Sequence, residues 1–306
     1  MQDPELRRRL PALRKRLLGR RKAVTVCIAG IHEDREGSSI MLICDRRVSL
    51  FGGLFSQDGN AKYSQVHRDW IGMFAGDVEE AHLMLREINR ALGQLKVGSF
   101  ENVVNRCRLS YIKSRKRLIE TRILPEYDIA SYSEFMKARR SDEALYLKIR
   151  EKISEAEEGW NLLFAGFDIA RTPHIFVVSG PGNVEYCDSQ KVAAIGSGAF
   201  AALFWISYYG YHSRRSLGEL LFGTISAKFF AERAQDVGEA TVVSAIRSNI
   251  DGLFHFSDNE IGGIRNAWNG LPKYSEDAVK QLESRMAMTY SMARAAAMAR
   301  SVKSNS

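Results

Sequence analysis

Residues 40–47 read Ile-Met-Leu-Ile-Cys-Asp-Arg-Arg, an apolar run that ends abruptly in one acidic and two basic residues. A run of this length and composition predicts a strand that is buried on both faces. Residues 23–31 (Ala-Val-Thr-Val-Cys-Ile-Ala-Gly-Ile) are also apolar, and the polar stretch between the two runs contains Gly37. The two runs therefore predict a hairpin at the centre of a large core.

Further apolar segments lie on both sides of a charged central stretch. Their lengths and periods predict strands at 70–75, 160–167, 175–178, 184–187, 192–195 and 241–246, and helices at 77–92, after Ser99, at 199–209, at 217–234 and from Ser275. Residues 108–158 are highly charged and helical in period, with a break near Pro125, so they predict an insertion of long surface helices. Strands followed by helix pairs favour antiparallel sheets covered by helices.

The composition is that of a globular protein with one large core. Apolar residues make up 45% of the 306 residues and charged residues 26%. No apolar run approaches the ~20 residues of a membrane span, and no secretory signal is visible at the N-terminus. The four cysteines and six histidines are scattered, without metal-ligand spacing. These features predict a cytoplasmic protein with no transmembrane segment, no metal and no cofactor.

The positive charge is concentrated at the N-terminus. Residues 1–22 hold nine Arg and Lys residues against Asp3 and Glu5, so they account for most of the net charge of +8. Leucines recur through this arm at helical spacing. A basic amphipathic arm could bind an anionic membrane surface or nucleic acid, or it could fold as a cap on the body or on a sister subunit. The predicted organisation is this arm, a main domain at 23–250 and a helical extension at 251–306.

Three residues at predicted strand ends form a candidate site. Asp45 ends one strand, Lys62 follows in the next segment, and Gly76 comes directly after another strand. A carboxylate, an arginine, a lysine and a backbone amide at strand ends are the parts of a site that can depress a pKa and hold an oxyanion. The alternative for Asp45 and Lys62 is a structural buried ion pair, and the two residues considered in isolation favour this interpretation. The alternative for Gly76 is a tight turn.

A second candidate is the turn at residues 196–198 (Gly-Ser-Gly), which opens a predicted helix. Such a turn could cradle a phosphate at the helix N-terminus, but the chain lacks the GxxxxGK[ST] loop that usually accompanies this role. Ser197 could instead cap the helix that starts near Ala199.

Five short motifs in this order resemble those of proteasome β-subunits and the bacterial HslV-type proteins, which are N-terminal nucleophile hydrolases. They are Asp45-Arg46-Arg47, Gly59-Asn60-Ala61-Lys62, Ala75-Gly76 with the following residues 77–81, residues 163–168, and residues 194–198 with the helix after them. The resemblance runs from about residue 23 to residue 246, and residues 108–158 lie outside it. It identifies the chain as a divergent bacterial member of that family. It implies an α+β fold, a four-layer αββα sandwich with a helical insertion.

The chemistry that this resemblance implies is acyl transfer by an N-terminal threonine, whose freed α-amine acts as the base. By resemblance, Lys62 would lower the pKa of the nucleophile, and Asp45 would keep that lysine charged. Arg47 would brace the pocket, and the Gly76 amide would donate to the oxyanion. Ser197 would complete the hydrogen-bond network beside the amine.

The sequence departs from the family pattern at the nucleophile. Thr25 fits the third position of the opening strand, and the first then falls on Ala23, which has no hydroxyl. A slip of two residues keeps the same strand face and places Thr25 in the nucleophile position. Val24 then precedes it, where the family usually has glycine. The later Asp-x-x-Ser motif is also missing, since Ala234 and Val237 stand in its place.

These departures predict a proteasome-like subunit that is unprocessed or catalytically degenerate and assembles into a homo-oligomeric ring or shell. The alternative is an active threonine-type peptidase or amidohydrolase, a hydrolase of the N-terminal nucleophile kind, that uses Thr25 after removal of the arm. A further alternative is binding of an anionic surface or nucleic acid through residues 1–22. The sequence does not give the substrate or the number of subunits.

Overall fold

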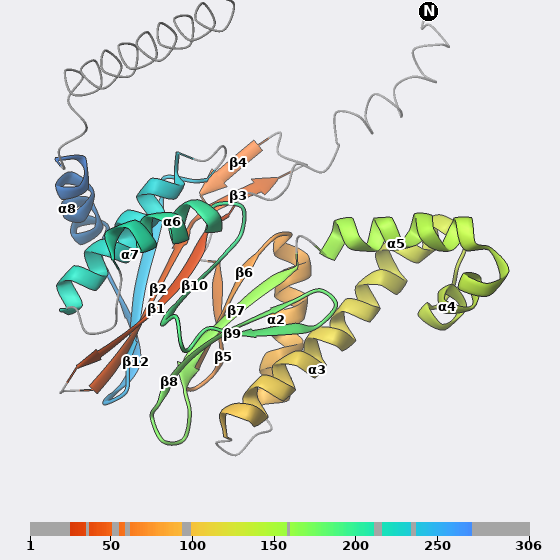
Figure 1. Cartoon of the computed structure of the whole chain (residues 1–306), viewed down its shortest axis with the longest axis horizontal. Helices are drawn as coiled ribbons and strands as arrows, with labels where there is room; N and C mark the ends of the chain where they lie inside the picture. Colours follow the sequence, from red (N-terminus) through yellow and green to blue (C-terminus); the bar gives the residue numbers. More distant parts are fainter. Residues whose placement is uncertain are drawn as a thin grey trace, which may run out of the picture. The chain divides into compact units, whose positions relative to one another are not determined.

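The computed structural model describes residues 25–34, 37–50, 55–58, 62–93, 99–157, 160–210, 216–233 and 237–270 (Figure 1). The basic arm at 1–22 and the helix expected from Ser275 lie outside these ranges. The chain divides into two compact units, residues 1–264 and 265–306. The fold described here is that of the first unit.

The first sheet has five strands and contains the predicted hairpin. Its strands are β1 (Cys27–Asp34), β2 (Gly37–Asp45), β10 (Val192–Ile195), β11 (Thr241–Arg247) and β12 (Ile250–His255). They lie in the order β10-β1-β2-β11-β12, and every neighbouring pair is antiparallel. Cys27 pairs with Cys44 across β1 and β2, which confirms the hairpin. β12 spans the predicted boundary between the main domain, which ends at residue 250, and the C-terminal extension. The predicted domain limits remain predictions.

The second sheet also has five antiparallel strands. They are β5 (Tyr63–His67), β6 (Trp70–Ala75), β7 (Asn161–Phe167), β8 (Pro173–Ser179) and β9 (Asn183–Tyr186), in sequence order across the sheet. A separate pair, β3 (Arg47–Leu50) and β4 (Phe55–Asp58), follows directly after β2. Asp45 ends β2 of the first sheet, and Lys62 comes just before β5 of the second sheet.

The apolar faces of the two five-stranded sheets pack against each other. Their common core includes Ala29 and Leu42 of the first sheet with Ile71, Leu163 and Ile175 of the second. Stacked sheets lie ~10 Å apart, so each buried face contributes a layer of side chains to one core. Helices cover the opposite face of each sheet, and burial on both faces explains why β2 is apolar over nearly its whole length.

The second sheet packs against α2 (Val78–Gly93) and α3 (Phe100–Leu118), through a core that includes Trp70, Phe74 and Phe164. The first sheet contacts α6 (Ala199–Tyr209) and α7 (Leu217–Ala231). α7 begins with a capping box, in which the Ser216 side chain and the Glu219 side chain each bond the other's backbone amide. The two helix pairs are seen at the two sheets in Figure 1.

The charged central stretch does not start a separate element at residue 108. α3 begins at Phe100 and runs to Leu118, and its buried residues on both sides of residue 108 join one core. The helix continues into a π-helical turn, η2 (Ile119–Ile123), and a 3₁₀ turn, η3 (Leu124–Tyr127), which contains Pro125. α4 (Tyr132–Ser141) and α5 (Glu143–Glu157) then pack chiefly against each other and η2.

The predicted fold class, a proteasome-like αββα sandwich with a separate helical insertion at 108–158, is therefore wrong as stated, because the described residues contain no separate insertion with these limits. The predicted insertion cuts through α3, and buried residues of α4 and α5 (Phe135, Ile149 and Ile153) belong to the same core as α2 and α3. The described residues also contain the β3–β4 pair and a helix α8 (Asp258–Asn269), for a total of seven α-helices. The supported description is the broader one, an α+β fold built on two antiparallel five-stranded sheets.

Candidate active site

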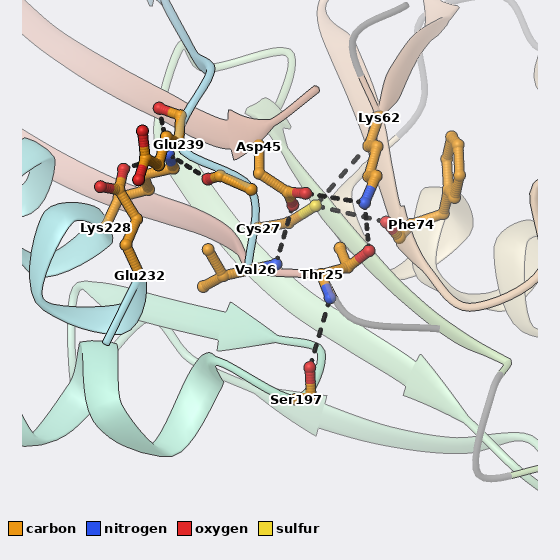
Figure 2. Close-up of polar contacts among 11 residues, drawn as sticks. Thr25, Val26, Cys27, Asp45, Lys62, Phe74, Ser197, Lys228, Glu232 and Glu239 are labelled. Carbon is orange, nitrogen blue, oxygen red and sulfur yellow. Dashed lines mark hydrogen bonds and ion pairs between the residues drawn. The ribbon is translucent and has the colours of Figure 1, made fainter. Parts of the chain in front are cut away.

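Thr25 lies two residues before the start of β1 and is almost completely buried. The Lys62 Nζ donates to its side-chain Oγ1, and the Thr25 backbone N–H donates to Ser197 Oγ over 3.3 Å (Figure 2). The hydroxyl and the main-chain nitrogen of one threonine therefore each have a polar partner from a different part of the chain. When the hydroxyl loses its proton, the adjacent ammonium can stabilise the negative charge on the oxygen.

Lys62 and Asp45 form an ion pair beneath Thr25. The Lys62 Nζ lies 3.0 Å from Asp45 Oδ2, and the two side chains are 4% and 0% exposed. The second carboxylate oxygen, Oδ1, accepts the backbone N–H of Val26 over 3.0 Å. A buried ion pair is tolerated when further hydrogen bonds satisfy its charges, and here one carboxylate faces both the lysine and the main chain beside Thr25.

The turn at residues 196–198 receives the main chain of Thr25. Gly196 has a φ of +96°, and a Cβ placed on it would lie 2.2 Å from the carbonyl oxygen of Thr25. The Gly198 N–H donates to the same oxygen over 3.1 Å. Ser197 does not cap α6, because the N-cap residue is Gly198 and it makes no side-chain cap bond. The turn thus needs glycine at 196 for close approach and a positive φ.

Gly76 follows β6 and has a φ of +126°, so the tight turn into α2 requires a residue without a Cβ. Its neighbour Ala75 reaches the site, since the Ala75 Cβ lies 3.3 Å from a Cβ placed on Gly196. Arg47 is the first residue of β3 and pairs with Asp58 on β4. The contacts thus bring together four of the six predicted site residues, Thr25, Asp45, Lys62 and Ser197. The predicted roles of Gly76 and Arg47 remain predictions.

Cys27 is a buried thiol in the site that the sequence analysis did not single out. Its Sγ donates to the Phe74 carbonyl oxygen over 3.2 Å, and its strand partner is Cys44. Burial raises the pKa of the Cys27 thiol well above its ordinary value, and the adjacent Cys44 raises it further. A thiol that stays protonated is a poor nucleophile, so the hydroxyl of Thr25 is the better candidate.

Lys228 is the second residue that the sequence analysis missed. It is fully buried on α7, and Figure 2 shows it with its partners Glu232 and Glu239. The sequence does mark this lysine, because it is the only charged residue between Leu220 and Ala231, among apolar and small residues. A lone charge in such a segment requires buried partners.

Two further features bear on other classes of function. Across the described ranges, no three or more His, Cys, Asp and Glu side chains are grouped so that they could hold a metal ion. Within the same part of the chain, no helix has the length and apolar character needed to cross a bilayer.

Comparisons with known proteins give a likeness of fold and no family. No family model matches the chain, and no curated protein matches it. Among solved structures, the chain is similar to an Anbu (Gly-1) mutant from Hyphomicrobium sp. strain MC1, with 16% identity and a TM-score of 0.55. The match covers 85% of this chain and 96% of that one.

At 16% identity the likeness concerns the fold alone. The identification of the chain as a divergent bacterial member of the proteasome β-subunit and HslV-type family is therefore wrong, since neither a family model nor a curated relative supports membership. The supported statement is that the chain is similar in fold to this Anbu protein.

Proposed function

We propose that the chain is a threonine-type amidohydrolase in which the Thr25 hydroxyl is the nucleophile. The observation that carries this proposal is the position of the Lys62 Nζ, which bonds both Thr25 Oγ1 and Asp45 Oδ2. An alcohol is a weak nucleophile unless its proton is removed or its developing charge is stabilised. The buried ammonium provides that stabilisation at the reacting oxygen.

The reaction has two halves, acylation of Thr25 and hydrolysis of the resulting ester, and each half forms one bond to the carbonyl carbon and breaks another. Thr25 Oγ1 attacks the carbonyl carbon of an amide and passes its proton to a base, and the C–N bond then breaks as the leaving amine takes that proton. Water next attacks the resulting ester, which releases the acid and restores the hydroxyl. In this scheme the Lys62 Nζ donates to the reacting oxygen, and Asp45 fixes the position of the lysine.

The base in this scheme is the α-amine of Thr25, so the peptide bond between Val24 and Thr25 must first be broken. The Thr25 nitrogen already lies 3.3 Å from Ser197 Oγ, which would orient the freed amine. In the proposed site the Gly76 amide donates to the oxyanion, a role whose loss typically costs about 100- to 1000-fold in rate. Arg47 would brace the substrate pocket.

Intact mass spectrometry of the full chain, before and after reaction with a β-lactone, tests this function. Attack by the Thr25 hydroxyl opens the lactone and adds its whole mass as an ester. We expect a chain that begins at Thr25 and carries one adduct, and we expect Thr25→Ser to retain labelling. Thr121→Ala is the matched control, because the Thr121 hydroxyl is exposed and bonds only its own helix. Equal labelling of Thr25→Ala and the wild type would contradict the proposal.

A second candidate is a subunit without catalytic activity that assembles with copies of itself. One exposed stripe on α6 favours it. Phe200, Phe204 and Tyr208 recur every four residues and are 83%, 56% and 69% exposed. Leu203, beside them, also lines a cavity of about 480 Å³ between α6 and strands β8 to β10. α6 carries no charged residue, so a second copy of the same stripe is a suitable partner.

The exposed aromatic area of the stripe is large enough to form the centre of an interface. Aromatic side chains bury about 150–250 Å² each, so these three leave on the order of 400 Å² exposed. A two-fold contact would bury about twice that from these side chains alone, and a stable interface needs about 1,200–2,000 Å² in total. The neighbouring helix surface would have to supply the remainder.

Light scattering on separated species tests assembly through α6. We expect the wild type to form a dimer or a larger oligomer, and Phe200→Lys to yield a smaller species because a buried lysine would lack a partner in the contact. Leu147→Lys is the matched control, since Leu147 is 58% exposed on α5. A wild type that is monomeric at high concentration, or an oligomer that Phe200→Lys leaves intact, would argue against this surface.

A further inference from the structure

Lys228 is a fully buried lysine that the proposed reaction does not use. From α7 its Nζ donates to Glu232 Oε1, to the carbonyl oxygen of Gly238 over 2.6 Å and to that of Glu239 over 2.9 Å. An ammonium has three donors and no acceptor, so these three oxygens match its capacity. The lysine therefore fastens α7 to the segment that leads into β11 (Figure 2).

The cost of burying this charge indicates that its contacts are specific. An ammonium taken out of water is stable only when paired and hydrogen-bonded. Two of the three acceptors are main-chain carbonyls of adjacent residues, so the lysine fixes the path of the backbone at 238 and 239. We therefore expect the lysine to act on the site through the backbone that it holds.

The fixed segment reaches the ion pair by a short covalent path. Ala240 follows Glu239, and its carbonyl oxygen accepts the backbone N–H of Arg46 over 3.1 Å. Thr241, the first residue of β11, is the strand partner of Asp45 at the end of β2. The position of the Gly238–Glu239 backbone thus determines where β11 meets the end of β2 that carries the carboxylate.

A second path runs through side-chain packing. A Cβ placed on Gly198 would lie 3.0 Å from Val237 Cγ2 and equally 3.0 Å from Val26 Cβ. Val237 therefore packs at the point where Gly198 and Val26 meet behind Thr25. The Val26 N–H donates to Asp45 Oδ1. A shift of residues 237–239 would therefore displace the carboxylate through both the β11–β2 pairing and the packing of Val237 near Val26.

We propose that Lys228 is a positioning residue of the Thr25 site, which acts by fixing the Gly238–Glu239 backbone and thereby the Asp45 carboxylate. The inference rests on the proposed function for its catalytic consequence. Its structural part, the coupling of Lys228 to the Asp45 end of β2, can be tested whether or not Thr25 is a nucleophile.

Amide-resolved hydrogen exchange on the full chain with Lys228→Met measures that coupling. We expect the amides of Val26 and Arg46 to exchange roughly tenfold faster or more, because their acceptors lose their fixed positions. The amide of Ile31 donates to the Lys191 carbonyl oxygen at the far end of β1 and serves as an internal reference. Its exchange should not change, whereas a loss of global stability alone would accelerate all three amides equally.

Labelling of Thr25 by the β-lactone gives the catalytic readout. We expect Lys228→Met to label about 100-fold more slowly, the penalty typical of a misplaced reacting group. Lys152→Met removes a lysine from an exposed pair with Glu155 and should label like the wild type. If Lys228→Met does not fold, Lys228→Gln keeps two donors at the site and should show the same local pattern in weaker form.

The outcomes separate the two claims. Wild-type protein that resists labelling ends the proposed hydrolase function, and the exchange pattern still decides the role of Lys228. Folded Lys228→Met or Lys228→Gln in which Val26 and Arg46 exchange no faster than Ile31, relative to wild type, would overturn the positioning role.

Discussion

Lys62→Met is expected to lower the free energy of unfolding by about 3–5 kcal/mol and to abolish labelling of Thr25. The substitution removes the cation that faces Asp45 Oδ2 and leaves a carboxylate with 0% side-chain exposure without its lysine partner. Removing one partner of a buried pair costs more than the pair contributes, because the remaining charge stays desolvated. Denaturant unfolding and intact-mass labelling give the two readouts.

The same experiment separates a structural ion pair from a catalytic one. Adding Asp45→Asn to Lys62→Met removes the remaining charge, so we expect the double variant to recover part of the lost stability. Labelling should not recover, because nothing then stabilises charge at Thr25 Oγ1. Recovery of labelling together with stability would show that the pair only supports the fold. Lys191→Met, in a more exposed pair with Glu33, controls for loss of an ordinary surface lysine.

The strongly apolar segments could be predicted from the sequence because burial leaves a direct record in composition. β6 and β10 have the limits that their apolar runs predict, 70–75 and 192–195, and α6 has the predicted limits of 199–209. β12 was missed, since Ile-Asp-Gly-Leu-Phe-His has neither an apolar run nor a clean alternation. An edge strand packs fewer neighbours than a central one, so its sequence is less constrained.

The site was only partly readable for a different reason. Asp45, Lys62 and Ser197 come from three distant segments, and no spacing rule states that the packing of two sheets brings them together. The short motifs that suggested a family mark strand ends and glycine turns, which any chain with this geometry requires. They therefore indicated a kind of fold, and they did not establish the family to which the chain was assigned.

Gly196→Ala is expected to displace Thr25 and to abolish its labelling. A methyl group at this position would lie 2.2 Å from the Thr25 carbonyl oxygen and 2.8 Å from its carbonyl carbon, both main-chain atoms. The φ of +96° adds strain of about 1–3 kcal/mol for a residue with a Cβ. The clash is with main-chain atoms of Thr25, so no side-chain rotation can relieve it. Either the chain before β1 or the 196–198 turn must move.

That movement breaks the bond from the Gly198 N–H to the Thr25 carbonyl oxygen and shifts Thr25 Oγ1 relative to Lys62. A displacement near 1 Å at a reacting group can cost about 100-fold in rate, so labelling should fall at least that far while a melting curve still shows a folded protein. Gly218→Ala is the matched control, because a Cβ there meets nothing within 4 Å. In the first turn of α7 it should stabilise slightly, by about 0.4–1 kcal/mol. Wild-type labelling in Gly196→Ala would mean that the turn does not set the position of Thr25, and that the hydroxyl is held by the Lys62–Asp45 pair alone.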